Sequence, residues 1–262
     1  MQDILDLDRF PLHELESVAG RELVARCREE LADTGMFNLS GFVQRAAIEQ
    51  CVSEVVPELA ANAYTHTQLH NIYFKAGIEG LSPDHPALKR SRTSNRKICG
   101  DQMKGFVLTQ IYEWPPLAAF LAEVMGKPRL YVMEDPLARV NVMTYRHGET
   151  LNWHFDRSEF TTTLLVQAPE SGGEFQYRTG LRTDDDPNYD GVARLLAGQD
   201  ENVRTVPLTA GTLNVFRGKN TAHRVSTIEG ERERIIAVYS YYERPGVTFS
   251  DEDRIRFYGR AA

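Results

Sequence analysis

The spacing of hydrophobic residues predicts helices in the first part of the chain. Over residues 15–31, apolar side chains recur at intervals of mostly three or four residues, and Gly35 follows as a C-terminal cap. A second helical stretch covers residues 43–63, where Pro57 is expected to kink or divide the helix. A third covers residues 115–126, from a Pro-Pro pair to a glycine. We therefore expect a mostly helical N-terminal part.

From about residue 138 onward the hydrophobic period changes to two, which is typical of strands. Short runs rich in β-branched and aromatic residues lie between turn signals, at 140–145, 160–167, 174–178, 203–208, 212–216, 222–227 and 234–242. Most of the gaps are too short for the helices that a parallel α/β sheet requires. The pattern predicts a mainly β protein with flanking helices and a double-stranded β-helix (jelly roll, cupin-like) core at 138–243. Residues 1–130 would pack on that core, in a single domain spanning residues 1–262.

Charge and composition exclude several kinds of partner. Lys and Arg number 30 against 37 Asp and Glu, a net charge of −7, whereas a nucleic-acid-binding protein needs a basic surface. Residues 1–6 lack the basic start and apolar run of a signal peptide, and no stretch approaches the roughly 20 apolar residues of a membrane span. We expect a cytoplasmic protein that binds neither nucleic acid nor membrane. Cys27, Cys51 and Cys99 have no CxxC spacing, so we expect reduced, buried thiols.

His154 and Asp156 are the first candidates for chemistry. On an extended backbone, side chains two residues apart point to the same face, so these two could bind one metal ion. With a second histidine they would make a 2-His-1-carboxylate facial site, which leaves adjacent coordination positions open in non-haem Fe(II) oxygenases. His223 is the best third ligand, because it follows one strand-like run and opens another, whereas His147 lies in the turn at Gly148. A bare His-x-Asp pair occurs often by chance and usually consists of two solvated surface side chains. The surrounding sequence therefore decides whether this pair binds a metal.

That context resembles the Fe(II)/2-oxoglutarate-dependent oxygenase superfamily across residues 138–243. The resemblance rests on Tyr145-Arg146-His147-Gly148 before His154-Phe155-Asp156, a GGE-type turn at 171–175, a PGxLxxF-like strand at 210–216, and His223-Arg224-Val225. It implies a metal site of His154, Asp156 and His223, with Fe(II), the cosubstrate 2-oxoglutarate and O₂. It further implies hydroxylation of an unactivated C–H bond, with release of succinate and CO₂.

The superfamily also carries a basic residue, about ten positions after the distal histidine, that pairs with the remote carboxylate of 2-oxoglutarate. Arg232 and Arg234 lie nine and eleven positions after His223. Arg234 is preferred because it abuts an apolar strand, and a guanidinium can grip a carboxylate with two parallel hydrogen bonds. Arg232 would then be a solvated strand-edge charge. Tyr145 and Asn141 would either contact 2-oxoglutarate or be satisfied core polar groups.

A narrower resemblance is to the BesD/HalD-like group of halogenases and hydroxylases that act on free amino acids and related metabolites. It is carried by residues 35–42, 70–74 and 153–155. In the halogenases a small residue, usually Gly, stands where this chain has Asp156, so that chloride can occupy the vacated iron position. With the carboxylate present, the resemblance implies a hydroxylase of a small molecule, most simply a free amino acid.

The same resemblance implies that residues 89–96 supply substrate contacts. Arg90, Arg92 or Arg96 would bind a substrate carboxylate, with Trp153 as a further contact; the alternative is a basic surface loop. Two other functions stay open. One is a peptidyl hydroxylase on the same fold, which would need a long open groove, and the other is a catalytically silent cupin-like metal-binding protein.

Overall fold

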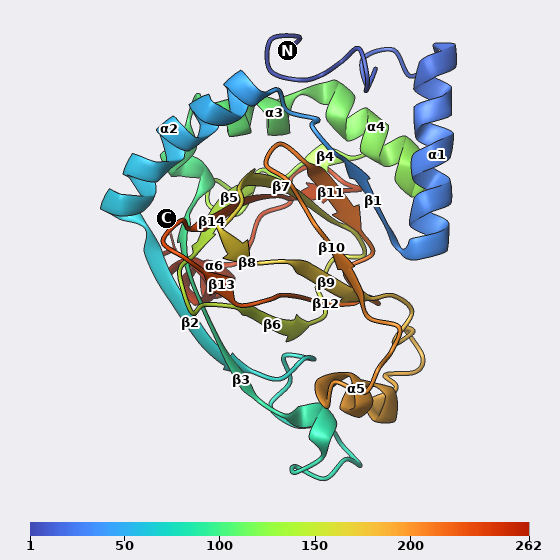
Figure 1. The fold of residues 1–262 in the computed structure, drawn as a ribbon, viewed down its shortest axis with the longest axis vertical. Helices are drawn as coiled ribbons and strands as arrows, with labels where there is room; N and C mark the ends of the chain where they lie inside the picture. Colours follow the sequence, from blue (N-terminus) through green and yellow to red (C-terminus); the bar gives the residue numbers. More distant parts are fainter. Residues whose placement is uncertain (262) are drawn as a thin grey trace.

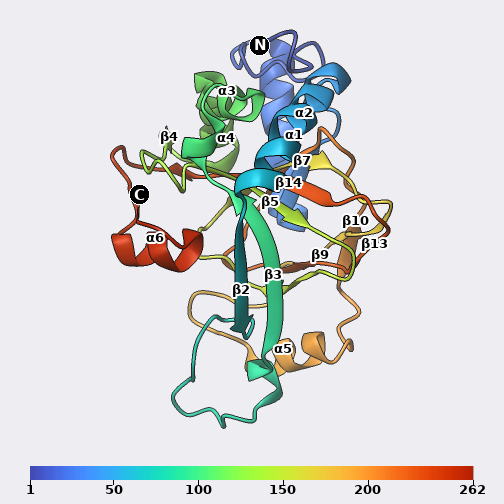
Figure 2. The same cartoon turned by 90° about the vertical axis from the view of Figure 1, so that its left-hand side faces the viewer.

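The computed structural model describes residues 1–261 and contains two facing antiparallel sheets, with helices over the outer face of the larger one (Figures 1 and 2). The larger sheet has the order β1 (Met36–Leu39), β11 (Leu213–Phe216), β7 (Thr161–Gln167), β14 (Arg234–Tyr239), β5 (Val140–Tyr145), β3 (Ser91–Ile98) and β2 (Tyr64–His70). The smaller sheet has the order β10 (Arg204–Val206), β9 (Phe175–Arg178), β12 (Ala222–Val225) and β6 (Leu151–His154). Two short pairs complete the strands: β13 (Ile228–Glu229) with β8 (Ser171–Gly172), and β15 (Tyr241–Tyr242) with β4 (Tyr131–Val132). This architecture confirms the predicted jelly roll.

The helices are α1 (Val18–Thr34), α2 (Arg45–Asn62), α3 (Val107–Glu113), α4 (Pro115–Met125), α5 (Tyr189–Leu196) and α6 (Asp251–Tyr258). The α1 helix begins where the Ser17 hydroxyl accepts a hydrogen bond from the backbone N–H of Gly20 at 3.0 Å, and it ends at Gly35 with φ 80°. Of the two expected effects of Pro57, a kink or a division, the division is absent, because α2 runs unbroken through it. The helix tolerates the lost hydrogen bond because one of its faces is buried along its length.

Side-chain alternation in the large sheet separates the main hydrophobic core from the space between the sheets. In β14, Ile235 and Ala237 pack into the core under α1–α4, whereas Ile236 joins a second cluster with Tyr145 and Val225 of the smaller sheet. The interior face of the large sheet therefore meets the smaller sheet. The three cysteines are free and buried, as expected. None of the helices within residues 1–261 is long and apolar enough to cross a membrane.

The N-terminal part supplies three strands that the hydrophobic pattern did not predict. Short β1 pairs with β11 at one edge of the large sheet, and β3 pairs with β5 and carries β2 at the other. The buried positions of β3 before its last residue, Ile98, are the polar residues Thr93, Asn95 and Lys97, so β3 lacks the apolar alternation that marks a strand.

Candidate metal centre and active site

The smaller sheet and the segment that follows β6 bring His154, Asp156 and His223 together. His154 ends β6 and lies directly opposite His223 of β12 in the antiparallel ladder. Asp156 comes just after β6, where its backbone N–H donates to the carbonyl of Gly218 at 3.0 Å. One ligand atom from each of the three lies within 4.8 Å of the others. The predicted triad is thus one cluster.

Backbone carbonyls orient both imidazoles. Nδ1 of His154 lies 2.8 Å from the carbonyl oxygen of Asn152, and Nδ1 of His223 lies 3.0 Å from that of Thr221. A carbonyl only accepts, so each Nδ1 carries the hydrogen and each Nε2 presents a lone pair. Both Nε2 atoms lie 3.4 Å from a carboxylate oxygen of Asp156. Acceptors that converge in this way fit a shared cation, and carbonyl-oriented histidines are typical of metal sites.

Asp156 is held in a tight polar setting. The Thr161 hydroxyl donates to its Oδ2 at 2.5 Å, and a Cβ on Gly218 would come within 2.4 Å of that oxygen. Burial by itself would raise the pKa of Asp156, but the His223 and His154 imidazoles hold that pKa well below its ordinary range. The pKa of His154 is lowered by burial first and then by His223. These shifts favour the anionic carboxylate and a neutral His154 imidazole, the protonation states that a divalent metal requires.

Arg234 and Tyr145 form a second polar site between the sheets. They are paired across β14 and β5, and Arg234 is only 1% exposed. Its Nε donates to the carbonyl of Gly173 at 3.1 Å, in the GGE-type turn. Within residues 1–261, neither its Nη1 nor the Tyr145 hydroxyl has a hydrogen-bond partner. Burial lowers the pKa of Arg234 to about 10, while the guanidinium still has no carboxylate partner in the described chain. A buried cation in this state fits an anionic ligand.

Arg232 and Asn141 are placed differently from Arg234. Arg232 is exposed, and its guanidinium donates to the backbone carbonyls of Ala168 and Pro169. The amide nitrogen of Asn141 donates hydrogen bonds to two backbone carbonyls, and its Oδ1 accepts a hydrogen bond from the Tyr258 hydroxyl at 2.9 Å. Both side chains are therefore already bonded within the protein.

The three arginines of the 89–96 segment do not face the metal cluster. Arg90 and Arg92 are exposed, and Arg96 pairs with Glu233 at 2.6 Å. Arg96 lies opposite Thr144, which also bonds Glu233, so its side chain leaves β3 on the side away from the smaller sheet. This geometry disfavours the substrate role expected for these arginines, because strand alternation turns Arg92 and Arg96 away from the cluster. Arg90 precedes β3, and its guanidinium donates to the carbonyl of Ala76.

Trp153 also points away from the metal cluster. It precedes His154 on β6, so it lies on the opposite face of the smaller sheet, where the Arg224 guanidinium covers its ring at 4.9 Å. There it lines a cavity of about 390 Å³ with Leu195 and Leu196 of α5. This placement disfavours the expected contact with substrate.

Phe74 and Arg182 lie near the cluster, and sequence reasoning did not single them out. Phe74 has a left-handed φ of 55°, and its ring centroid lies 5.9 Å from that of His154. The Asn71 side chain fixes this turn by bonding the backbone of Lys75 and the N–H of Tyr73. A non-glycine residue in that conformation is strained and often marks a functional site.

The guanidinium of Arg182 lies 3.9 Å from the ring centroid of Phe155, the residue between His154 and Asp156, and it donates to the Lys219 carbonyl. Burial lowers the pKa of Arg182, and Asp156 opposes that shift. No residue-spacing rule predicts this position.

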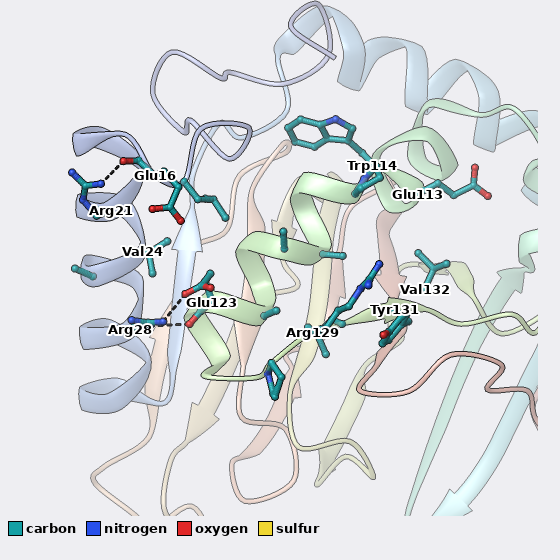
Figure 3. Close-up of a pocket in the computed structure, with 18 residues that line it drawn as sticks. Glu16, Arg21, Val24, Arg28, Glu113, Trp114, Glu123, Arg129, Tyr131 and Val132 are labelled. Atoms are coloured by element: carbon teal, nitrogen blue, oxygen red, sulfur yellow. Dashed lines mark hydrogen bonds and ion pairs between the residues drawn. The ribbon is translucent and has the colours of Figure 1, made fainter.

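A separate cavity of about 760 Å³ lies between α1, α4 and residues 128–132, where Arg28 and Glu123 form an ion pair at 2.9 Å (Figure 3). Its lining does not include the metal cluster or Arg234. It lies among the helices and not between the sheets, so we place the chemistry at the metal cluster.

Comparison with known proteins identifies the family. The model of a family described as Halogenase D matches residues 19–250. A search of curated proteins found no match. Among similar solved structures, the 2-oxoglutarate-dependent epimerase SnoN from nogalamycin biosynthesis has TM-score 0.58 and 13% identity, covering 85% of this chain and 83% of that one. HygX from Streptomyces hygroscopicus, solved with nickel and 2-oxoglutarate, has TM-score 0.55 and 14% identity, covering 82% and 85%.

A prolyl-4-hydroxylase from Pseudomonas putida has TM-score 0.51 and 15% identity, covering 82% of this chain and 97% of that one. At such identities the structural likeness shows the fold, while the family model spans most of the chain. The chain therefore belongs to the Halogenase D family, and its jelly roll is that of the 2-oxoglutarate- and Fe(II)-dependent oxygenases.

Proposed function

We propose that the protein is a 2-oxoglutarate-dependent Fe(II) dioxygenase that hydroxylates an unactivated C–H bond of a small carboxylate metabolite, most simply a free amino acid. The observation that carries this proposal is the pairing of two sites between the sheets. One is the convergent cluster of His154, Asp156 and His223, and the other is the buried Arg234, which has no carboxylate partner within residues 1–261.

The proposal assigns metal binding and 2-oxoglutarate binding to different residues. His154, Asp156 and His223 would hold Fe(II), and Arg234 with the Tyr145 hydroxyl would bind the remote carboxylate of 2-oxoglutarate. When bound, Fe(II), 2-oxoglutarate and O₂ supply the oxidising power that replaces a hydrogen of the substrate by hydroxyl, with release of succinate and CO₂. The protein contributes orientation, because the Asn152 and Thr221 carbonyls fix both imidazoles.

Asp156 supports hydroxylation over halogenation. Its carboxylate would serve as the third protein ligand, leaving no vacated ligand position for a halide, and the Thr161 hydroxyl donates a hydrogen bond to it. Membership of a family named for a halogenase therefore does not by itself imply halogenation by this chain. HygX was solved with nickel and 2-oxoglutarate, which supports the assignment of metal and cosubstrate.

Contacts between chain segments near the metal cluster favour a small substrate. The Tyr73 hydroxyl donates to the carbonyl of Pro187 at 2.8 Å, which ties the 71–75 turn to the 184–187 loop. On another side, Arg157 pairs with Asp253 of α6 at 3.3 Å. These links join chain segments near the cluster, and they favour a small substrate over an extended peptide.

The proposal is tested by an anaerobic screen of the Fe(II)/2-oxoglutarate form against free amino acids, followed by mass spectrometry after O₂ is admitted. We expect one amino acid to gain an oxygen atom while stoichiometric succinate appears. A protein that binds metal but forms no succinate with any of them would instead be a silent metal-binding jelly roll.

A further inference from the structure

Lys97 of β3 directs its side chain into the space between the two sheets. It pairs with Met143 of β5, which packs against the Tyr145 cluster between the sheets. The next residue, Ile98, packs on the opposite side, in the core under the helices. Alternation along the strand therefore points Lys97 inward, the reverse of Arg96.

The inward face of β3 continues to the metal cluster and to the Arg234–Tyr145 site. The Thr93 hydroxyl accepts a hydrogen bond from the Asn152 amide at 3.1 Å, and the carbonyl of Asn152 orients His154. Burial raises the pKa of Tyr145 to about 12, and the charge of Arg234 and, less strongly, the Asn95 side chain oppose that shift. Lys97 is the next inward residue after Asn95, so it lines the same space.

Lys97 is buried, and no counter-ion for it lies within residues 1–261. The residue is 6% exposed, and its ammonium makes no ion pair or hydrogen bond with any residue from 1 to 261. The Lys97 ammonium contacts an aromatic ring instead: its Nζ lies 5.7 Å from the ring centroid of Tyr258 of α6. Burial lowers the pKa of Lys97 to about 8. A cation removed from water normally needs a paired charge, and residues 1–261 do not supply one to Lys97.

The surroundings of Lys97 favour an anion. The pKa of His66, across the β2–β3 edge, is lowered to about 4 by burial first and then by the charges of Lys97 and Arg256. Arg256 itself is exposed, and its guanidinium lies 5.6 Å from the ring centroid of Phe257. Lys97 is thus a buried cation near a neutral imidazole.

We propose that Lys97 binds the carboxylate of the organic substrate and so sets which carbon faces the metal cluster. This inference rests on the proposed function and adds the substrate-anchoring residue to it. One ammonium neutralises one carboxylate, whereas a phosphate dianion would leave a buried charge unpaired. The predicted substrate class is therefore a small carboxylic acid, bound with its acid group toward β3 and α6.

The test compares each free amino acid with its primary carboxamide, which has the same shape but no acidic charge. Binding is read under anaerobic conditions from the change that each compound causes in the visible charge-transfer band of the Fe(II)/2-oxoglutarate protein. We expect at least one acid to change the band and its amide to bind about 30-fold more weakly or worse. Lys97→Met should lose the response to the acid by a similar factor while 2-oxoglutarate affinity stays within about three-fold.

Two variants serve as controls. Arg92→Met removes a cation from the same strand but from its exposed outer face, and it should bind the acid as the unmodified protein does. Lys97→Arg keeps the charge and should recover part of the affinity. A Lys97→Met variant that binds the acid normally overturns the proposal, and so does a panel in which no acid changes the band although 2-oxoglutarate binds. Absence of the 2-oxoglutarate band itself would refute the proposed function, and the Lys97 assignment with it.

Discussion

Arg234 and Tyr145 lie directly opposite one another on β14 and β5, and both side chains are completely or almost completely buried. The Nη1 of one and the hydroxyl of the other lack a hydrogen-bond partner within residues 1–261. Leaving such groups unsatisfied costs on the order of 1–3 kcal/mol each, and more when the group is charged. A ligand carboxylate would satisfy both at once.

We predict that Arg234→Gln raises the apparent KM for 2-oxoglutarate about 30-fold or more, since losing a charge-assisted bidentate pair costs on the order of 2–5 kcal/mol. Arg232→Gln should change KM less than about two-fold, because its guanidinium is exposed and bonds only backbone carbonyls. Steady-state succinate formation at varied 2-oxoglutarate measures both. The opposite ranking would transfer the role to Arg232.

We predict that His223→Ala abolishes stoichiometric Fe(II) binding, because two protein ligands hold the metal poorly. His147→Ala is the matched control, since His147 accepts a hydrogen bond from the Gly230 backbone N–H and lies outside the cluster. Metal content after anaerobic loading and gel filtration should fall from about one ion per chain to nearly zero in the first variant only. An unchanged metal content in His223→Ala would show that the cluster is misassigned.

We predict that Asp156→Gly opens a position for chloride but gives a poor halogenase. The substitution frees the Thr161 hydroxyl and vacates a ligand position, while the residues around it still suit a carboxylate. Chloride titration should change the visible band of the variant and not that of the unmodified protein, and chlorinated product should stay minor by mass spectrometry. Chlorination as efficient as the original hydroxylation would show that the vacancy alone was limiting.

We predict that Asp135→Asn destabilises the protein by about 3–5 kcal/mol, as expected when one member of a buried ion pair is removed. Asp135 is completely buried, and it accepts from Arg254 of α6 at 2.8 Å and from the backbone N–H groups of Phe249, Ala138 and Leu137. Urea unfolding at pH 7 measures the change. Asp251→Asn, which removes the exposed partner of Arg254, should cost less than about 1 kcal/mol.

The same carboxylate gives a pH dependence. Burial would raise the pKa of Asp135, but its hydrogen bonds and Arg254 outweigh burial, so the folded-state pKa lies below the ordinary value. The unfolded chain then binds the proton more readily, so this stabilisation is present above about pH 4 and is lost as pH falls through the folded-state pKa. The stability difference between the protein and Asp135→Asn should shrink with acidification. A difference that stays constant down to pH 3 would contradict this assignment.

The sequence predicts the metal cluster well because its geometry is local or marked by motifs. His154 and Asp156 lie two residues apart next to one strand, and Arg234 begins a recognisably apolar one. The substrate side of the site was harder to predict. The inward face of β3 carries the polar residues Thr93, Asn95 and Lys97, so the hydrophobic pattern did not mark β3 as a strand. Without a strand, the sequence does not show that Arg96 and Lys97 point to opposite faces. Lys97 has no counter-ion within residues 1–261, which depends on where the fold places the carboxylates of other elements, and no local sequence pattern encodes this.

The central claim is that Fe(II) at the triad and 2-oxoglutarate at Arg234 act together, and anaerobic spectroscopy of the Fe(II)-loaded protein tests it most directly. Adding 2-oxoglutarate should produce a visible charge-transfer band that saturates at one equivalent, is absent in His223→Ala, and bleaches with formation of succinate when O₂ is admitted. A protein that binds Fe(II) at the triad but gives neither the band nor succinate at saturating 2-oxoglutarate would contradict the account.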